Sequence, residues 1–538
     1  MNTANSDVTI RQIMDQSGVR FGTSGARGLA ADMTAPVCFA YTAAFLQVVS
    51  PPAGGRVALG LDLRSSSPDI AGACAAAIRQ AGMIPEFCGV LPTPALAYYA
   101  QEQGIPAIMV TGSHIPFDRN GIKFYRADGE IDKADEQAIL DAEVAVPDAL
   151  SPAPLPAVDA SALEAYVARY TAFFGEGALA GMRVALYEHS SVARDVLRTV
   201  FERLGAEVLS LGRTDTFVPI DTEAVRAEDI AQARAWAQAH RFDAILSTDG
   251  DADRPLIGDE TGTWLRGDVV GILCAQYLHA DVVVTPVSSN TAVEKCGAFR
   301  QVLRTRIGSP YVIAGMDTQR GAGRVVGYEA NGGFLLGSDV EYGEAIGASA
   351  AETAGVGAGS VGTGGFGSAE LGSAELGSAG FGSAEVATDG PEATQKCLPA
   401  GAARLKALPT RDSLLPMLAL LAMARAKGCP VSQLADALPR RFTASDRIQN
   451  VPTEFSRALI ARLQQTPAEA AALMAPDAGD VIAIDTTDGL RTSFATGEIV
   501  HLRPSGNAPE LRCYAEAADE PRARALCDAC LARIAASA

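Results

Sequence analysis

Three aspartates at alternate positions form the strongest chemical signal in the chain. Asp249, Asp251 and Asp253 directly follow the short apolar run 242–247. Alternation in an extended segment places their carboxylates on one side, where they can converge on a hard cation such as Mg²⁺. A solvated acidic turn is the alternative, but crowded carboxylates without a counter-charge are unfavourable. An EF-hand is disfavoured because its sixth position requires glycine, and Arg254 stands there.

A serine followed by basic residues lies at the end of another apolar run. The segment 111–116 reads Thr-Gly-Ser-His-Ile-Pro, and Asn-Gly-Ile-Lys follows at 120–123. Ser113 therefore stands at the end of a predicted strand, where functional loops of α/β sheets lie. With His114 and Lys123 to supply proton transfer and positive charge, it suits covalent acyl or phosphoryl transfer, although an ordinary turn is the alternative. The absence of a Gly-x-Ser-x-Gly elbow disfavours a hydrolase.

A third loop, 503–509, reads Arg-Pro-Ser-Gly-Asn-Ala-Pro, and Arg512 lies beyond it. A guanidinium, a hydroxyl and glycine-flanked amides in one turn can bind a phosphate, although Pro-Ser-Gly turns are also common. The chain contains no Gly-Lys dipeptide and no Gly-x-Gly-x-x-Gly after a predicted strand, so ATP and NAD are not indicated. Together, the three loops predict phosphoryl transfer among sugar phosphates.

The chain as a whole is acidic. Its 538 residues include 63 acids and 44 bases, for a formal charge of −19, and 48% are hydrophobic. This length predicts two to five domains, and the charge disfavours nucleic acid as a partner. The N-terminus lacks the order of a signal peptide, and no apolar stretch reaches the roughly 20 residues that span a bilayer. The ten cysteines form no disulfide framework. We therefore expect a cytoplasmic protein without a membrane partner, and we interpret the Cys-x-x-Cys at 527–530 as part of a core helix.

Short β-branched runs alternate with alanine-rich helical runs, which predicts α/β units with mostly parallel sheets. The last hundred residues instead predict a small α+β domain with an antiparallel sheet. The acidic, proline-rich stretch 144–158 is predicted to be a connection and a domain boundary. The predicted strands are 56–61, 107–111, 182–187, 242–247, 281–286, 481–485, 491–495, 499–502 and 511–515, and the predicted helices are 68–82, 191–205, 454–463 and 521–535.

A low-complexity insertion occupies about 348–394. Within it, Gly-Ser-Ala-Glu-Leu and close variants repeat every five residues over 367–386. The period matches neither helix nor strand, and the composition offers too little apolar surface to offset chain entropy. We interpret the segment as a flexible insertion, with a binding tail as the alternative.

Deletion of residues 356–386 is expected to leave turnover near normal, because the segment lacks core-forming residues. The measurement is kcat of the purified deletion variant beside the full chain. A large fall would mean that the insertion gates the substrate cleft.

Five motifs in order resemble the α-D-phosphohexomutase superfamily, the phosphomannomutases and phosphoglucomutases, and most of all the bacterial phosphomannomutases. The motifs are Phe-Gly-Thr-Ser-Gly-Ala-Arg-Gly at 21–28, the serine loop, the aspartate loop, Gly-Tyr-Glu-Ala-Asn-Gly-Gly at 327–333, and the loop 503–509. The resemblance implies an α/β fold of four domains around a central cleft: three related α/β domains with mixed sheets, at 1–155, 156–262 and 263–440, and a C-terminal α+β domain at 441–538.

The resemblance also implies roles for single residues. Ser113 would carry the phosphoryl group, and its phosphoserine oxygen would complete a Mg²⁺ site with the three aspartates. His114, Lys123 and Arg27 would serve proton transfer and charge stabilisation. The substrate-binding residues would be Ser24, Arg254, Gly308, Ser309, Glu329, Asn331, Arg503, Ser505, Gly506, Asn507 and Arg512.

The implied reaction interconverts mannose 6-phosphate and mannose 1-phosphate through a phosphoserine enzyme, with a hexose 1,6-bisphosphate as intermediate and activator. Phosphoglucomutase and phosphoglucosamine mutase are the nearest alternatives. A metal-dependent sugar-phosphate phosphatase and a catalytically inactive binding protein are alternatives of other classes. Asn331, Ser309 and the Asn-Ala pair at 507–508 depart from the pattern of many relatives, and the first two bear on the identity of the sugar. We expect a monomer or a weak homo-oligomer.

Overall fold

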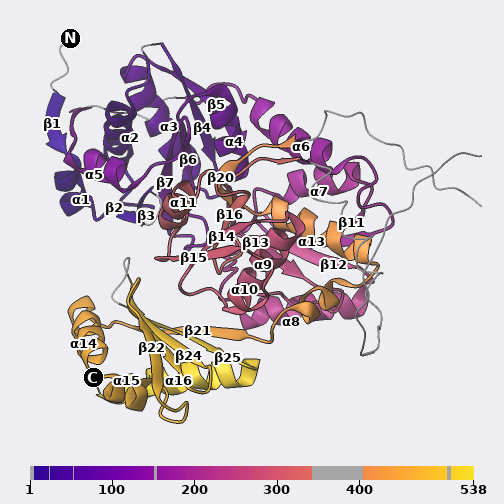
Figure 1. Cartoon of the computed structure of the whole chain (residues 1–538). Coiled ribbons are helices and arrows are strands. Elements are labelled where there is room, and N and C mark those ends of the chain that lie inside the picture. Colours follow the sequence, from indigo (N-terminus) through magenta and orange to yellow (C-terminus); the bar gives the residue numbers. More distant parts are fainter. Residues whose placement is uncertain are drawn as a thin grey trace, which may run out of the picture. The chain divides into compact units, whose positions relative to one another are not determined.

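The computed structural model describes residues 5–22, 25–52, 54–148, 150, 154–341, 404–505 and 510–537. These residues include four sheets of four or more strands, each packed with helices (Figure 1). The repeat insertion lies outside the described residues, as do Ser24, Gly506 and Asn507.

The two faces of the first sheet pack against two different hydrophobic cores. Its strand order is β2-β3-β7-β6-β4-β5; β4 pairs in parallel with β5 and β6, and the other neighbours pair antiparallel. In β6, Ile108 and Val110 enter one core while Ala107 and Met109 enter another, as the two-residue period of a strand requires. The strands are β2 (Arg20–Gly22), β3 (Gly25–Leu29), β4 (Arg56–Leu61), β5 (Ile84–Val90), β6 (Ala107–Val110), β7 (Arg119–Arg126) and β8 (Gly129–Glu130), which pairs with β7.

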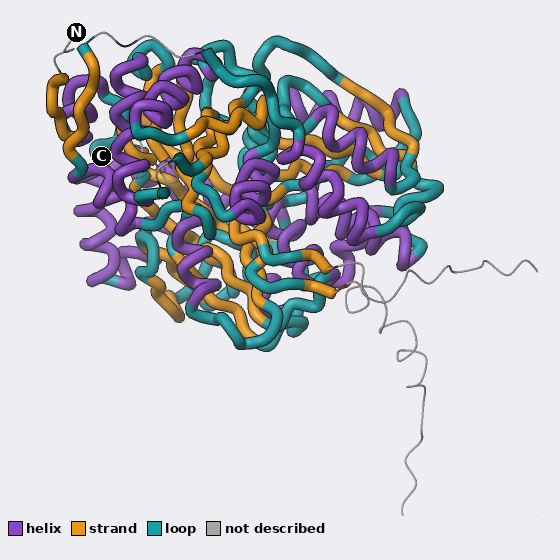
Figure 2. Tube along the Cα trace, turned by 90° about the horizontal axis from the view of Figure 1, so that it is seen from above, coloured by secondary structure: helices purple, strands orange, loops and turns teal. Residues whose placement is uncertain are grey.

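Helices cover both faces of this sheet. The core on one face contains residues of α2, α3 and α5, and the core on the other contains residues of α4 together with α6 of the next unit. Figure 2 shows the strands running between helices in this way. The helices are α1 (Ile10–Ser17), α2 (Ala35–Val49), α3 (Ser67–Gln80), α4 (Thr93–Gln103), α5 (Lys133–Asp141) and α6 (Ser161–Phe174).

The second and third sheets are also mixed, each with three parallel strands followed by antiparallel ones. Their strand orders are β11-β10-β12-β13 and β15-β14-β16-β17-β20. The second unit contains β10 (Arg183–Tyr187), α7 (Arg194–Arg203), β11 (Glu207–Leu211), α8 (Ala227–Ala239), β12 (Ala244–Thr248) and β13 (Pro255–Gly258). The third contains α9 (Gly267–Tyr277), β14 (Val282–Pro286), α10 (Ala292–Lys295), β15 (Gln301–Thr305), α11 (Ser309–Asp317), β16 (Val325–Tyr328), β17 (Phe334–Leu336), β20 (Leu408–Asp412), α13 (Leu414–Lys427) and the 3₁₀ helix η1 (Val431–Ala437), with the short pair β18 (Val340–Glu341) and β19 (Arg404–Leu405).

The C-terminal sheet is wholly antiparallel, as the sequence predicted, and has its own hydrophobic core. Its strand order is β21-β25-β24-β23-β22. Cys527 and Cys530 are fully buried in that core, on the helix where the sequence placed them. The elements are β21 (Phe442–Gln449), α14 (Thr453–Gln465), α15 (Pro467–Met474), β22 (Val481–Asp485), β23 (Leu490–Phe494), β24 (Ile499–Pro504), β25 (Glu510–Ala517) and α16 (Glu520–Ser537).

The prediction that residues 144–158 form a connection was wrong for the first residues of that stretch. The stretch 144–158 begins inside β9 (Glu143–Pro147), which pairs antiparallel with β1 (Asn5–Thr9). Val144 and Val146 are buried while their neighbours are more exposed, so the alternation of a half-buried strand was present under the proline-rich composition. The expectation of mostly parallel sheets also gives way to three mixed ones, because β7, β13 and β17 each turn back antiparallel beside the parallel strands.

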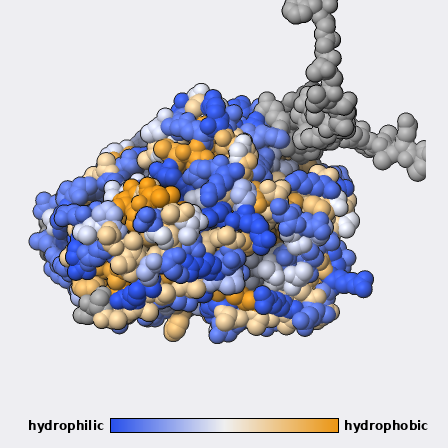
Figure 3. All heavy atoms as spheres, turned by 60° about the horizontal axis from the view of Figure 1, so that its bottom comes forward, coloured by the Kyte–Doolittle hydropathy of each residue, from blue (hydrophilic) through white to orange (hydrophobic). Residues whose placement is uncertain are grey.

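No single helix among the described residues is long and apolar enough to cross a membrane. The helices α13 and η1 meet that length and composition only as a pair, with a bend of 86° between them. On the face drawn in Figure 3, hydrophilic residues predominate and hydrophobic ones lie in small separate groups.

Candidate active site

The residues predicted to do chemistry follow the carboxyl ends of parallel strands in three sheets. Ser113 lies in the loop after β6, Asp249 directly follows β12, and Glu329 directly follows β16. Loops at this end of a parallel strand are where α/β proteins place ligands. The described contacts connect these three loops into one buried polar network.

Ser113 points its hydroxyl at the aspartate loop. Its Oγ donates a hydrogen bond to Oδ2 of Asp249 at 2.6 Å, and its backbone N–H donates to Oγ1 of Thr111 at 2.8 Å. The residue is buried and has a φ of 52°, in the left-handed region that non-glycine residues rarely adopt. Such backbone strain persists only where the surroundings hold it in place.

The three aspartates form one cluster, with an oxygen from each within 4.8 Å of the others. All three are buried, and the left-handed φ of Ala252 turns the loop between the second and third. Burial and the two neighbouring carboxylates raise the pKa of Asp249 well above its usual value. Oδ1 of Asp251 and Oδ1 of Asp253 are buried and accept no hydrogen bond from the described residues. Buried carboxylate oxygens that accept no hydrogen bond, in a group of three aspartates, fit a hard divalent cation such as Mg²⁺.

Two cations partly balance this negative charge. Nζ of Lys123, on β7, donates to Oδ2 of Asp251 at 2.6 Å and to Oδ2 of Asp253 at 2.7 Å. Burial opposes the charge of Lys123, but these two carboxylates prevail and raise its pKa. Burial likewise opposes the charge of Asp253, yet Arg411 and Lys123 hold its pKa well below the ordinary range. Lys123 and Asp253 are therefore charged at neutral pH.

The imidazole of His114 lies between Ser113 and an arginine of the aspartate loop. Its Nδ1 is 3.4 Å from Oγ of Ser113 and accepts a hydrogen bond of 3.0 Å from Nη1 of Arg254. Burial and the nearby guanidinium lower the pKa of His114 well below its usual value. Burial, with Arg254 and Arg411 nearby, also lowers the pKa of Arg27 to about 10. The guanidinium groups of Arg254 and Arg27 thus lie beside the carboxylate cluster, where they could contact a phosphate.

The loop after β16 presents a buried carboxylate. Glu329 accepts a hydrogen bond of 2.9 Å from Nη1 of Arg411. The side chain of Asn331 accepts from the N–H of Gly333 at 2.9 Å, which closes the loop on itself. The hydroxyl of Thr222, in the second unit, donates a hydrogen bond to the backbone carbonyl oxygen of Asn331. This contact connects the loop to the second unit.

The structure describes the two ends of the predicted phosphate loop, residues 503–505 and the residues from 510 onward. Arg503 and Arg512 are paired neighbours on β24 and β25, so their side chains leave the same face of the sheet. Nε of Arg503 is 2.8 Å from Oδ2 of Asp488. A pocket of about 360 Å³ opens here, lined by Arg306, Arg457, Arg503 and Ser505 among others. That volume is within the range of small-molecule sites, and its guanidinium groups favour an anion.

Two other predicted substrate residues are placed differently. Gly308 has a φ of 131°, which favours glycine, and ends the loop before α11. The next residue, Ser309, is fully buried and donates its hydroxyl to Oε2 of Glu130 at 3.0 Å. The structure therefore engages the Ser309 side chain in a contact between the first and third units.

Sequence comparison assigns the family. Four models of the phosphoglucomutase/phosphomannomutase family match in order: alpha/beta/alpha domain I at residues 18–144, domain II at 164–262, domain III at 266–354 and the C-terminal domain at 450–533. The chain belongs to the phosphoglucomutase/phosphomannomutase family. This confirms the resemblance and the α/β class predicted from the motifs, and it makes the chain a phosphohexomutase, an enzyme of the isomerase class.

Relatives and solved structures agree with this membership. The chain is 42% identical over 509 residues to a phosphomannomutase of Salmonella muenchen, covering 94% of this chain and 93% of that protein. It is also 42% identical over 523 residues to one from Sinorhizobium fredii, covering 94% and 96%. The crystal structure of a putative phosphomannomutase from Thermus thermophilus superposes with a TM-score of 0.67 at 20% identity, covering 97% and 99%, which supports the fold.

Arg411 is the site residue that sequence reasoning missed. It lies on β20, where Nη1 donates to Glu329 and Nη2 donates to Oδ2 of Asp253 at 2.7 Å. The buried guanidinium of Arg411 thus connects Glu329, which is expected to bind the sugar, to the aspartate loop of the second unit. The available signal was an Arg-Asp pair at the end of the short segment Leu-Pro-Thr-Arg-Asp, which is too common a pattern to single out.

Arg411→Met is expected to lower the free energy of unfolding by about 3–5 kcal/mol, because it leaves the buried Glu329 without its cation and removes one of the cations paired with Asp253. The measurement is urea denaturation of the purified variant. Arg320→Met is the matched control, since Arg320 pairs with Asp317 on the surface and should change stability by less than about 1 kcal/mol. Equal stabilities for the two variants would contradict the role given to Arg411.

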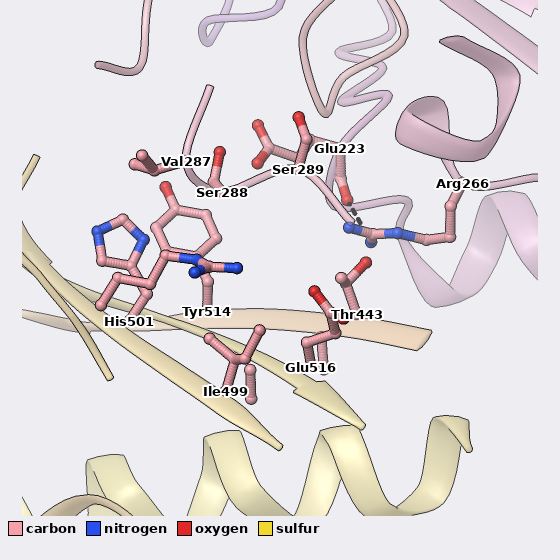
Figure 4. A pocket seen from close by; sticks show the side chains of 13 residues that line it. Glu223, Arg266, Val287, Ser288, Ser289, Thr443, Ile499, His501, Tyr514 and Glu516 are labelled. Carbon is pink, nitrogen blue, oxygen red and sulfur yellow. Dashed lines mark hydrogen bonds between the residues drawn. The ribbon is translucent and has the colours of Figure 1, made fainter. Parts of the chain in front are cut away.

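A second cavity lies where the C-terminal sheet meets the second and third units (Figure 4). Glu223 and Arg266 line one side, and the ring of Tyr514 points from the sheet toward Ser288. Its volume of about 20 Å³ holds about one water molecule and is too small for a hexose phosphate. Beside it, the N–H of Thr291 donates to Oε2 of Glu516 at 3.1 Å, a contact that ties β25 to the third unit.

Proposed function

We propose that the enzyme interconverts mannose 6-phosphate and mannose 1-phosphate through a phosphorylated Ser113. The observation that carries the proposal is the hydrogen bond of 2.6 Å from Oγ of Ser113 to Asp249, which presents a nucleophilic oxygen directly at the carboxylate cluster. The choice of mannose is supported by the two phosphomannomutases that are 42% identical to the chain over nearly their full length.

In the forward step, the phosphoryl group moves from Ser113 to the free hydroxyl of the hexose phosphate. The bond between phosphorus and Oγ breaks, and a bond between phosphorus and the sugar oxygen forms. The proton of the hydroxyl passes to His114, whose lowered pKa leaves the imidazole neutral, while Lys123, which is charged, would stabilise charge on the transferring group. The resulting hexose 1,6-bisphosphate turns over and returns its other phosphoryl group to Ser113. Such transfer depends chiefly on alignment and charge neutralisation.

We assign the metal to the aspartate loop. Asp249, Asp251 and Asp253, with an oxygen of the phosphoserine, would hold Mg²⁺, which neutralises charge on the transferring group. Arg254 and Arg27 border the same place and would contact that group's oxygens. Added hexose 1,6-bisphosphate is the proposed activator, because it phosphorylates Ser113.

The far end of the substrate would be held by Glu329 and the phosphate loop. Glu329 would accept hydrogen bonds from sugar hydroxyls, with Asn331 beside it. Arg503, Ser505, Gly506, Asn507 and Arg512 would bind the phosphate that is not reacting. Ser24, Gly308 and Ser309 stay predicted substrate residues, and the cytoplasmic location and the monomeric or weakly associated state stay predictions.

Phosphorus NMR tests the proposal. The purified chain is supplied with Mg²⁺, a trace of hexose 1,6-bisphosphate and either mannose 1-phosphate or glucose 1-phosphate. The matching 6-phosphate should grow in both tubes without free phosphate, and faster from mannose 1-phosphate. Faster conversion of glucose 1-phosphate would make glucose the preferred sugar. Activity on glucosamine phosphate alone would make the substrate a hexosamine phosphate. Release of inorganic phosphate in place of isomer would indicate a phosphatase.

A further inference from the structure

A buried arginine outside the five motifs holds the main chain of the serine loop. Arg64 lies after β4 and is 4% exposed. Its two terminal nitrogens donate to four backbone carbonyl oxygens: Nη2 to those of Ser113 at 2.9 Å and Ile115 at 2.6 Å, and Nη1 to those of Pro116 at 2.7 Å and Arg119 at 2.9 Å. Three of the acceptors belong to the loop that carries the nucleophile, and the fourth, Arg119, begins the strand β7 that follows it.

The guanidinium is itself fixed from three sides. Asp62 lies 3.3 Å from its Nε and also accepts from the N–H of Gly112 at 3.2 Å. The ring of Phe217, from the second unit, stacks on it with the centroid 4.2 Å from Cζ. Gly112 leaves room for it, since a Cβ there would lie 2.4 Å from Cζ of Arg64. These contacts hold the guanidinium in one orientation toward the loop.

This clamp acts where the loop is strained. Ser113 has a left-handed φ, which is unfavourable for serine by itself and must be maintained by its surroundings. Its carbonyl is one of the four that Arg64 binds, while its Oγ meets Asp249 from the other side. A displacement of about 1 Å at a reacting group can cost about a hundredfold in rate.

We propose that Arg64 is a positioning residue, which fixes the backbone of residues 113–119 so that Ser113 faces the carboxylate cluster. Arg64 contacts neither the aspartate loop's carboxylates nor the phosphate loop through any described hydrogen bond, so it acts through the main chain. The inference deepens the proposed function and depends on it for the identity of the transferred group.

The test is Arg64→Lys, which keeps the charge but loses the planar fork of donors. We expect kcat to fall about 10- to 100-fold, while KM for the sugar phosphate changes less than about threefold, because Glu329 and the phosphate loop, proposed to hold the sugar and its far phosphate, lie on other units. Phosphorylation of the variant by glucose 1,6-bisphosphate, followed by intact mass, should slow by the same factor as kcat. A merely structural role would lower the yield of folded enzyme without slowing the folded fraction.

Arg533→Lys is the matched control. Arg533 also donates to two backbone carbonyls, those of Leu473 and Met474, but lies in the C-terminal unit away from the site. It should leave kcat and the phosphorylation rate unchanged. If folded Arg64→Lys phosphorylates Ser113 at the rate of the unchanged chain, the proposal is overturned.

A second variant keeps the proposal testable should Arg64→Lys fail to fold. Gly112→Ala displaces the guanidinium by contact and should reproduce the same kcat loss at unchanged KM; normal kcat in that variant would contradict the clamp. Where both single variants fold, their combination should lose no more than the worse single change, because both act through one contact. If the fold-losses in kcat of the two single variants multiply in the double variant, the two residues act separately.

Hydrogen exchange separates this inference from the proposed function. In Arg64→Lys, amides of residues 113–119 should exchange faster than in the unchanged chain while the rest of the first sheet keeps its protection. If the unchanged chain isomerises no hexose phosphate, the proposed function fails, and the exchange result still decides whether Arg64 holds the loop. Unaltered exchange in that loop would overturn the clamp whatever the substrate.

Discussion

Ser113→Ala is expected to abolish isomerisation, with kcat reduced by at least about 10⁴-fold. The substitution removes the atom that carries the phosphoryl group in the proposed reaction, and among the residues that the structure describes no other hydroxyl donates to the carboxylate of Asp249. The protein should still fold, because the change loses one hydrogen bond, worth about 1 kcal/mol. The measurement is turnover of mannose 1-phosphate with saturating Mg²⁺, and thermal unfolding beside it.

A second readout identifies the missing step. Glucose 1,6-bisphosphate should add one phosphoryl group to the unchanged chain and none to Ser113→Ala, as intact mass shows directly. Ser456→Ala is the matched control, since Ser456 is buried on α14 and donates only to the carbonyl of Pro452. Full turnover by Ser113→Ala would overturn the assignment of the nucleophile.

Asp251→Asn has the second largest expected effect, a loss of Mg²⁺-dependent turnover of about 10²- to 10³-fold. Oδ2 of Asp251 accepts from Lys123 and from Oγ1 of Thr93, and Oδ1 is left free for a metal. Asparagine keeps the shape but removes one negative ligand. Because changes to residues that only orient metal ligands cost about 10- to 100-fold in affinity, loss of a ligand should cost at least as much.

Folding should survive this substitution. Removing one of three crowded carboxylates relieves repulsion, and Lys123 keeps Asp253 at 2.7 Å. Calorimetric titration with Mg²⁺ should show affinity lowered at least tenfold, whereas Asp195→Asn on the surface helix α7 should bind as the unchanged chain does. Unfolding of Asp251→Asn at ordinary temperature would instead show that the aspartate loop is structural.

Local sequence indicated the chemistry and located every strand and helix that it predicted, although the structure contains many more. The ordered motifs identified the family because their loops supply the reacting groups of a phosphohexomutase. The chemistry of these groups constrains residue type and spacing within each loop. Strands such as β4, predicted and found at 56–61, are readable because burial on both faces leaves a continuous apolar run. The strand β9 was missed because its alternation is only five residues long beside proline-rich sequence.

Tertiary structure decided which distant residues serve the site. Arg411 meets Asp253 across 158 positions, Arg64 meets Ser113 across 49, and Ser309 meets Glu130 across 179. None of these pairs has a spacing rule, because strands far apart in the sequence come together through sheet pairing and packing and not through any local period. A buried guanidinium finds its carboxylates or carbonyls only once the sheets have assembled. The sequence by itself thus determined the reaction and its loops, while the packed structure determined what holds those loops in register.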